Sequence, residues 1–185
     1  MTRVCLVGND DVNLRYELLS RETSRNALVT YDLREPFENA IGIETVSLGA
    51  AVALLNDLDW YLIRFVEEAL VLEPSISDDE WLSRDLAAEI RANEADAETV
   101  DRYLKVYGIE QPGEDGTDTK DSTASDDPGD ESDTEDESAE PTQDRPPRLV
   151  EPMLVARTGE TIPEYDLRHV EETLVVRLTE SEFDA

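Results

Sequence analysis

The chain has 185 residues and a formal net charge of −30, from 46 acidic and 16 basic side chains. So few basic groups exclude general nucleic-acid binding, which depends on Lys and Arg neutralising phosphates. No stretch reaches about 18 apolar residues without charges, so we expect no membrane partner. The start of the chain runs into a strand pattern instead of a signal sequence, which predicts a cytoplasmic protein. The length favours one domain, with or without a tail.

The basic residues are unusual because 14 of the 16 are arginine. A surface this acidic repels itself at low salt. Molar salt shortens the Debye length to about 3 Å and removes most of that repulsion. The composition therefore predicts halophilic adaptation. In that case the net charge reflects a salt-rich solvent and says little about a binding partner. The alternative is an ordinary acidic protein with a disordered tail.

The charge is unevenly distributed, which suggests three regions. Residues 111–147 hold 14 acidic and two basic side chains and almost no aliphatic ones. Such a segment lacks the apolar surface that would offset its ordering entropy, so we expect a disordered acidic linker. Residues 1–110 then form an N-terminal α/β part, and residues 148–185 a C-terminal strand pair that packs on it.

The first region alternates between strand-like and helix-like patterns. Apolar runs ended by turn residues predict strands, and the apolar stripes between them predict helices. In chain order we expect a strand at 4–7, a helix at 12–25, a strand at 27–33, one helical turn at 36–41 and a strand at 43–48.

Residues 50–72 show the strongest helical pattern, with leucines on one half of the circumference and charged residues on the other. Trp60 and Ile63 fall on or near the polar half, which indicates either a covering layer or a Trp lying flat on the surface. The remaining expected elements are helices at 78–92 and 96–107, and strands at 149–157 and 173–179. The order predicts an α/β (α+β) two-layer sandwich with a ferredoxin-like start, extra helices and a C-terminal strand pair.

Most catalytic chemistries find no support in the sequence. The first strand ends in Gly8-Asn9-Asp10-Asp11, where carboxylates would compete with a phosphate for the backbone donors. The single histidine, His169, lies in a charged connection, and the single cysteine, Cys5, lies within a strand. These residues predict neither a catalytic triad nor a zinc site, so we expect no cofactor and no metal.

Residues 4–22 resemble the opening of phospho-acceptor receiver domains, in which an acidic pair after the first strand holds Mg²⁺. Asp57 and Lys105 fall near that family's acceptor and lysine positions. However, Asp57 lies in the expected long helix, and no fourth strand is expected at 73–95. A degenerate receiver is therefore kept only as a lesser alternative.

A tetrapeptide recurs in the chain, as Tyr31-Asp32-Leu33-Arg34 and as Tyr165-Asp166-Leu167-Arg168. Either the repeat is accidental, or two equivalent strand exits present their arginines at one edge. Two guanidinium groups at one edge bind a carboxylate or phosphate bidentately. The second interpretation makes Asp32, Arg34, Asp166 and Arg168 candidate ligand-binding residues for a small anion.

Five segments of the chain carry a resemblance to known sequences: Met1 to Gly8, Tyr31 to Pro36, Leu54 to Phe65, Leu104 to Gly108 and Thr179 to Phe183. Through them the whole chain resembles a small acidic haloarchaeal protein family of unknown function, which implies a halophilic, cytoplasmic protein but no activity.

Two functional hypotheses follow. The first is a non-enzymatic interaction or regulatory module that binds a protein partner or a second copy through Trp60 and Ile63. The second is a small-molecule binder or enzyme that uses the arginine and aspartate residues of the repeat. A DNA mimic built from the acidic linker is weaker, because a flexible tract has no fixed charge spacing and salt screens it.

Overall fold

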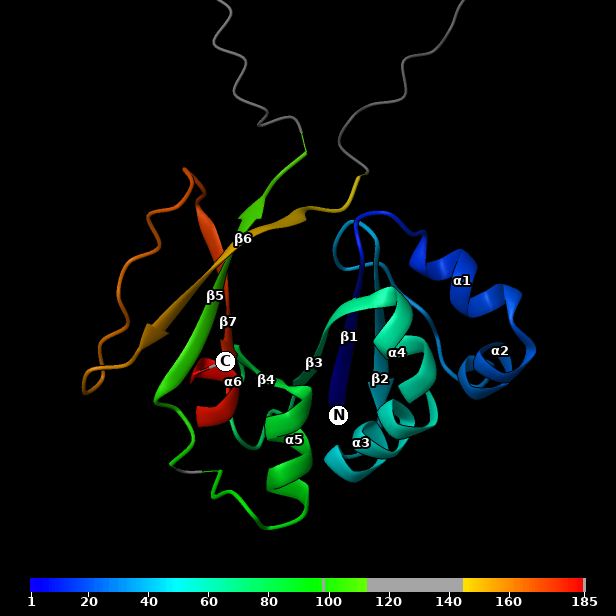
Figure 1. The fold of residues 1–185 in the computed structure, drawn as a ribbon, viewed down its shortest axis with the longest axis horizontal. Coiled ribbons are helices and arrows are strands. Elements are labelled where there is room, and N and C mark those ends of the chain that lie inside the picture. The colour runs from blue at the N-terminus through cyan, green and yellow to red at the C-terminus, as the bar shows by residue number, and fades with distance from the viewer. Residues whose placement is uncertain (98, 113–144, 185) are drawn as a thin grey trace, which may run out of the picture.

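The computed structural model describes residues 1–97, 99–112 and 145–184. This part of the chain forms one seven-stranded sheet, in the order β2-β1-β3-β4-β7-β5-β6, with six helices (Figure 1). The expected mixed α+β fold is confirmed. Most of the expected acidic linker lies outside the described residues.

The strands are β1 (Thr2–Gly8), β2 (Ala40–Thr45), β3 (Val66–Leu72), β4 (Glu80–Ser83), β5 (Tyr103–Glu110), β6 (Arg148–Ala156) and β7 (Glu172–Arg177). The helices are α1 (Leu14–Ser20), α2 (Glu22–Leu28), α3 (Leu48–Asp57), α4 (Asp59–Phe65), α5 (Arg84–Arg91) and α6 (Glu180–Asp184). No helix in these residues is long and apolar enough to cross a membrane.

Strand β1 lies between two antiparallel neighbours, and its alternating side chains supply both faces of the sheet. Val4 and Leu6 point to one face, where they pack with residues of all the first five helices in the largest apolar core. Cys5 and Val7 point to the opposite face and join a second cluster with residues of β5 and β7. The period-two alternation of a strand explains this division.

The sheet is curled, because segments next to its two ends meet. Strands β2 and β6 are the two edge strands, at opposite ends of the strand order. Nevertheless the backbone N–H of Glu38, just before β2, donates to the carbonyl oxygen of Pro147, just before β6, at 2.8 Å. The second apolar cluster therefore lies inside the curl, and the first lies under the helices outside it.

The strands expected at 4–7, 149–157 and 173–179 are confirmed as β1, β6 and β7. Two expectations near β2 are wrong. Helix α2 continues to Leu28, so no strand occupies 27–33, and β2 begins at Ala40 where a helical turn was expected. The single helix expected at 12–25 is divided into α1 and α2, because Arg21 between them has an extended backbone conformation (φ −103°, ψ 132°).

The long helix expected at 50–72 is wrong in its last third. The helix is interrupted at Leu58 and becomes a strand at Val66, because the segment Val66–Leu72 pairs with β1. The expected helix at 96–107 is wrong throughout its described residues: those before Tyr103 form no helix, and β5 begins at Tyr103 and pairs with β6 and β7. In both segments, sheet pairing overrides a helical pattern.

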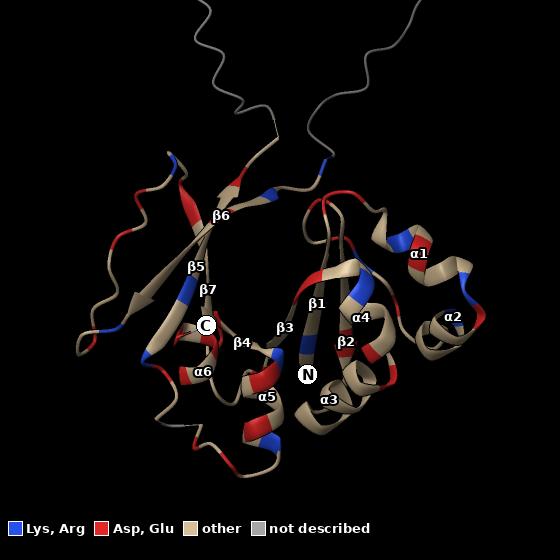
Figure 2. Cartoon of the chain, viewed as in Figure 1, with Lys and Arg blue, Asp and Glu red and all other residues tan. Residues whose placement is uncertain are grey.

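The helix expected at 78–92 begins later than predicted. Ser77 forms a turn, in which its Oγ accepts from the backbone N–H of Glu80 at 3.1 Å, and β4 follows. The helix itself is capped by Ser83, whose Oγ accepts from the N–H of Leu86 at 3.2 Å. Asp and Glu residues (red) occur on helices and strands across the whole fold, with Lys and Arg residues (blue) scattered between them (Figure 2).

Candidate functional site

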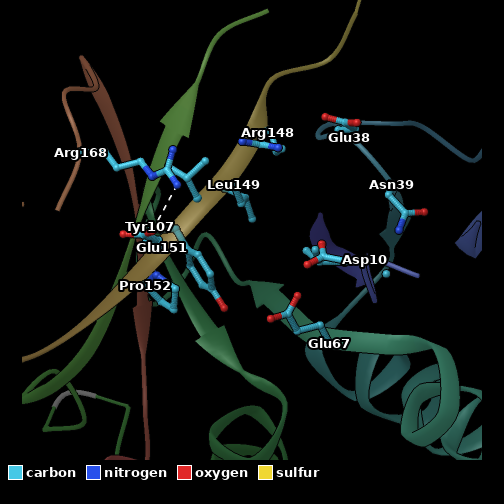
Figure 3. Close-up of a pocket in the computed structure, with 13 residues that line it drawn as sticks. Asp10, Glu38, Asn39, Glu67, Tyr107, Arg148, Leu149, Glu151, Pro152 and Arg168 are labelled. Carbon is cyan, nitrogen blue, oxygen red and sulfur yellow. Dashed lines mark hydrogen bonds and ion pairs between the residues drawn. The ribbon is translucent and has the colours of Figure 1, made fainter. Parts of the chain in front are cut away.

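A pocket of about 600 Å³ opens where the end of β1 faces the first half of β6 (Figure 3). We call it the charge-divided pocket, because three carboxylates line one wall, whereas the other wall carries two arginines and a single carboxylate, Glu151. Its lining consists of Val7, Gly8, Asp10, Glu38, Asn39, Glu67, Tyr107, Arg148, Leu149, Val150, Glu151, Pro152 and Arg168.

The acidic wall is organised by Asn39, which has a left-handed φ of 56°. Its side-chain amide donates to the carbonyl oxygens of Asn9 and Val12, both at 2.9 Å, and so holds the loop that carries Asp10. The close approach requires a glycine at the end of β1, since a Cβ at Gly8 would lie 2.7 Å from Asn39 Nδ2. The sequence thus builds a fixed loop at this wall.

Three carboxylates belong to the acidic wall: Asp10, Glu38 and Glu67. Glu67 is presented by a bulge, because Val7 pairs with Glu68 whereas Gly8 pairs with Val66. Within the described part of the chain, no cationic side chain pairs with any of the three. Their charges face the pocket uncompensated.

Arg148 and Arg168 form the opposite wall and share a carboxylate outside the pocket. Glu110 lies 3.4 Å from Arg148 Nη2 through Oε1 and 3.6 Å from Arg168 Nη1 through Oε2. Arg168 Nη2 also lies 3.1 Å from Glu151 Oε1. A guanidinium has five N–H donors, so both arginines keep donors for a further acceptor.

The floor of the pocket contains Tyr107, whose position is fixed by Glu68. Its hydroxyl donates to Glu68 Oε2 at 2.7 Å, and Lys105 Nζ donates to the same oxygen at 2.9 Å. Burial is the main cause that raises the pKa of Tyr107, and the Glu68 carboxylate raises it further. The phenol therefore stays protonated and engaged with Glu68, which makes it a structural donor and a poor acid.

The four candidate ligand-binding residues of the repeated tetrapeptide do not all line this pocket. Arg168 lines the charge-divided pocket. Arg34 is exposed and forms a backbone bridge with Gly42 beside β2. Asp32 and Asp166 are exposed and do not line this pocket. The hypothesis that the two arginines hold one anion stays a prediction.

Trp60 and Ile63 lie on α4 with 46% and 71% of their surfaces exposed. Trp60 is nevertheless in contact with its surroundings. The guanidinium carbon of Arg64 lies 3.9 Å from its ring centroid, and that of Arg21 lies 5.5 Å away. Stacked arginines thus cover part of a ring that the sequence placed on a polar surface.

The receiver-like residues do not form an acceptor site. Asp57 is the last residue of α3 and does not follow a strand. Lys105 is committed to Glu68. Among the described residues, no group of three or more His, Cys, Asp or Glu side chains is arranged to hold a metal ion. The Cys5 thiol is fully buried, which raises its pKa to about 12.

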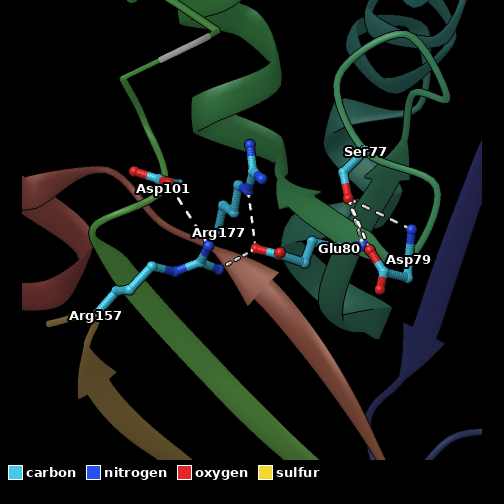
Figure 4. Close-up of polar contacts among 6 residues, drawn as sticks. All are labelled: Ser77, Asp79, Glu80, Asp101, Arg157 and Arg177. Carbon is cyan, nitrogen blue, oxygen red and sulfur yellow. Dashed lines mark hydrogen bonds and ion pairs between the residues drawn. The ribbon is translucent and has the colours of Figure 1, made fainter. Parts of the chain in front are cut away.

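A second polar cluster lies where β4 meets β7 and was not found by sequence reasoning (Figure 4). Glu80 Oε1 accepts from Arg157 Nη2 at 2.5 Å and from Arg177 Nε at 3.0 Å. Asp101 lies 3.5 Å from the other terminal nitrogen of Arg157. The three residues of the Glu80 contacts are far apart in sequence, so spacing gives no signal of this cluster.

A family model described as a family of unknown function (DUF5804) matches residues 2–109. The match includes β1 to β4 and nearly all of β5, and thus the acidic wall and the floor of the pocket. The arginine wall, on β6 and the segment before β7, lies beyond it. No curated protein and no solved structure matches the chain.

Proposed function

The chain belongs to DUF5804, a family of unknown function, and we propose that it is a non-enzymatic binding module whose small-molecule ligand occupies the charge-divided pocket. The observation that carries this proposal is a cavity of about 600 Å³ with opposite charges on its walls. Small-molecule sites are concave and combine apolar lining with a few oriented polar groups. The hydrogen bonds of Asn39 and the contacts of Glu68 hold the lining of this pocket in place without a ligand.

A non-catalytic role is supported by the state of the reactive side chains. The hydroxyl of Tyr107 is engaged with Glu68, and the pKa of this group is raised. The Cys5 thiol is buried and has a raised pKa, so its nucleophilic thiolate is disfavoured. Binding thus accounts for the pocket without a reactive group.

The test compares two tryptophan substitutions on the same edge strand. Pro152 lines the pocket, whereas Leu154 is 48% exposed and does not. The wild type, Pro152→Trp and Leu154→Trp are incubated with a small-molecule extract in molar KCl, separated by gel filtration and analysed by mass spectrometry. We expect a compound retained by the wild type and Leu154→Trp but lost from Pro152→Trp. Equal retention by all three proteins, or none, would overturn the proposal.

A second candidate function is a protein-interaction or regulatory module, favoured by the exposure of Trp60 and Ile63 on one short helix. The partner is then another protein or a second copy of the chain. Replacing Ile63 with Glu should lower the mass of the complex measured in molar KCl and leave the circular dichroism spectrum intact. An unchanged mass would exclude this face as the interface.

We further propose that the protein functions in the salt-rich cytoplasm of a halophile, as a net charge of −30 and 14 arginines among 16 basic residues suggest. Carboxylates such as Asp10, Glu38 and Glu67 lie without cationic partners among the described residues. The free energy of unfolding should therefore rise as KCl is increased to molar concentrations. A protein that is equally stable without salt would contradict this.

A further inference from the structure

We infer that the charge-divided pocket binds a bipolar small molecule, with an ammonium group at one end and a carboxylate at the other. This inference rests on the proposed binding function and specifies the chemical class of the ligand. It depends on how the charges are distributed between the two walls and on the apolar surface that separates them.

The ammonium end is assigned to the acidic wall. Asp10, Glu38 and Glu67 come from three different segments and converge on one side of the pocket (Figure 3). Since none of them has a cationic partner in the described residues, a ligand ammonium would meet no competing side chain. An ammonium has three donors and forms charge-assisted hydrogen bonds with carboxylates.

The carboxylate end is assigned to Arg148 and Arg168. The contact of Arg148 with Glu110, at 3.4 Å, involves one terminal nitrogen and leaves the other donors of this half-exposed side chain available. Arg168 reaches toward the pocket from the segment before β7, and Glu151 holds its guanidinium there at 3.1 Å. A ligand carboxylate fits the planar donor geometry of a guanidinium better than any neutral acceptor.

The distribution of charge disfavours ligands of a single sign. A dicarboxylate would place one anionic group against the unpaired Asp10, Glu38 and Glu67. A diamine would place one ammonium against the wall of Arg148 and Arg168, where Glu151 is the single lining carboxylate beside two guanidinium groups. Like charges brought together in a partly enclosed site cost free energy, whereas a bipolar ligand satisfies both walls.

An apolar strip between the walls would contact the carbon chain of the ligand. Val7 belongs to β1 on the acidic side, and Leu149, Val150 and Pro152 belong to β6 on the arginine side. The Tyr107 ring lies between these two sides (Figure 3). Burying a methylene group contributes about 0.8 kcal/mol. This strip, and not charge alone, distinguishes the pocket from the acidic surface elsewhere on the molecule.

The test uses three ligands with six carbon atoms each, ε-aminocaproate, hexamethylenediamine and adipate, together with shorter and longer members of each series. Affinities are measured by calorimetry on the full chain in molar KCl, because exposed charges are largely screened there and attraction to the general surface is suppressed. We expect an amino acid of the series to bind at least about tenfold more tightly than the matched diamine and dicarboxylate, since one ion pair replaces one repulsion.

Variants that remove one charge from a wall show which charged group of the ligand that wall binds. Arg148→Gln should weaken the amino acid about tenfold and reduce its advantage over the diamine. Glu67→Gln should weaken it and reduce its advantage over the dicarboxylate. Asp78→Asn and Glu164→Gln remove exposed carboxylates that do not line the pocket, and should leave all affinities unchanged.

Other outcomes separate the inference from the proposed function. If the diamine or the dicarboxylate binds best, the inference is wrong and the pocket is still a binding site. If no member of the three series binds, the inference is wrong. The proposed function is then decided separately by the extract experiment, in which Pro152→Trp should abolish the retention of a compound. If the control variants weaken binding as much as Glu67→Gln, the amino acid is bound by the general surface and the inference is wrong.

Discussion

The two halves of the sheet differ in the size of their apolar cores. Strands β2, β1 and β3 pack on the helices through a large core of leucine, isoleucine and valine side chains. Strands β7, β5 and β6 have only a small cluster on their outer face, of which Leu104, Val106 and Val155 are the buried members. The first half therefore has the larger apolar core, whereas the second combines its small outer cluster with the inner cluster that contains Tyr107, Leu174 and Val176.

The boundary between the halves is β4, whose pairing with β3 joins only Leu70 to Ser83 and Val71 to Leu82. Polar contacts reinforce this boundary on both faces. Glu80 joins β4 to Arg177 of β7, and inside the curl Glu68 of β3 reaches Lys105 of β5. The charge-divided pocket lies between the same halves, with β1 and β3 on one side of it and β6 on the other.

The largest expected difference between the halves follows from truncating one apolar side chain in each core. Leu55 is 1% exposed in the large core, whereas Met153 is half-buried in the small cluster. We expect Leu55→Ala to lower the free energy of unfolding by about 3 to 4 kcal/mol and Met153→Ala by about 1 kcal/mol, because the cavity left in a close-packed core costs more. Denaturant unfolding in molar KCl measures both. Equal losses would mean that the two halves are packed alike.

The next largest effect is expected at the boundary. The side chains of Glu80, Arg157 and Arg177 are 15%, 13% and 10% exposed. Glu80→Gln would leave two largely buried guanidinium groups without their shared carboxylate, and we expect a loss of about 3 kcal/mol in the free energy of unfolding. The control is Glu164→Gln, an exposed carboxylate in the segment before β7. A loss as small as in the control would show that the ion pairs do not hold the boundary.

The same division explains what sequence reasoning could predict. The short apolar runs of β1, β6 and β7 are bounded by polar or turn residues, so their local pattern is sufficient. The segments Val66–Leu72 and Tyr103–Glu110 carry residues that suit a helix as well as a strand. Their strand conformation is decided by pairing with β1, β6 and β7, which are distant in sequence.

The candidate site was only partly accessible from the sequence. Arg168 was found through the repeated tetrapeptide, and the exposure of Trp60 and Ile63 through helical periodicity. Arg148 and Glu67 carry no local signal, because the curl of the sheet brings them to one pocket. The bulge that presents Glu67 and the link from Glu38 to Pro147 are tertiary features.

A pH titration asks whether the two halves unfold as one unit. Burial raises the pKa of Cys5, on β1, from 9.0 to about 12, and the pKa of Tyr107, on β5, is also raised. Above pH 9 the native state therefore binds more protons than the unfolded state, so the free energy of unfolding falls as pH rises. The loss from Cys5 should be about 1.4 kcal/mol per pH unit until pH about 12.

The variants Cys5→Val and Tyr107→Phe separate the two groups. Each should reduce the slope of stability against pH, the first from about pH 9 and the second from about pH 10. If the sheet unfolds cooperatively, both changes appear in one transition, whether it is followed by circular dichroism or by tryptophan fluorescence. Two transitions, each sensitive to one variant, would show that the halves unfold separately. An unchanged slope in Cys5→Val would contradict the burial of its thiol.

The smallest expected effect concerns the outer surface of the helical half. The Arg64 guanidinium carbon lies 3.9 Å from the centroid of the half-exposed Trp60 ring, and such a contact at an exposed site contributes about 0.5 to 1 kcal/mol. Arg64→Gln should lower the free energy of unfolding by that amount and make Trp60 fluorescence more easily quenched by iodide. Arg15→Gln, an exposed arginine on α1 without an aromatic partner among the described residues, is the control. If the two variants behave alike, the stacked arginine does not shield the ring, and the Trp60 surface is open to a protein partner.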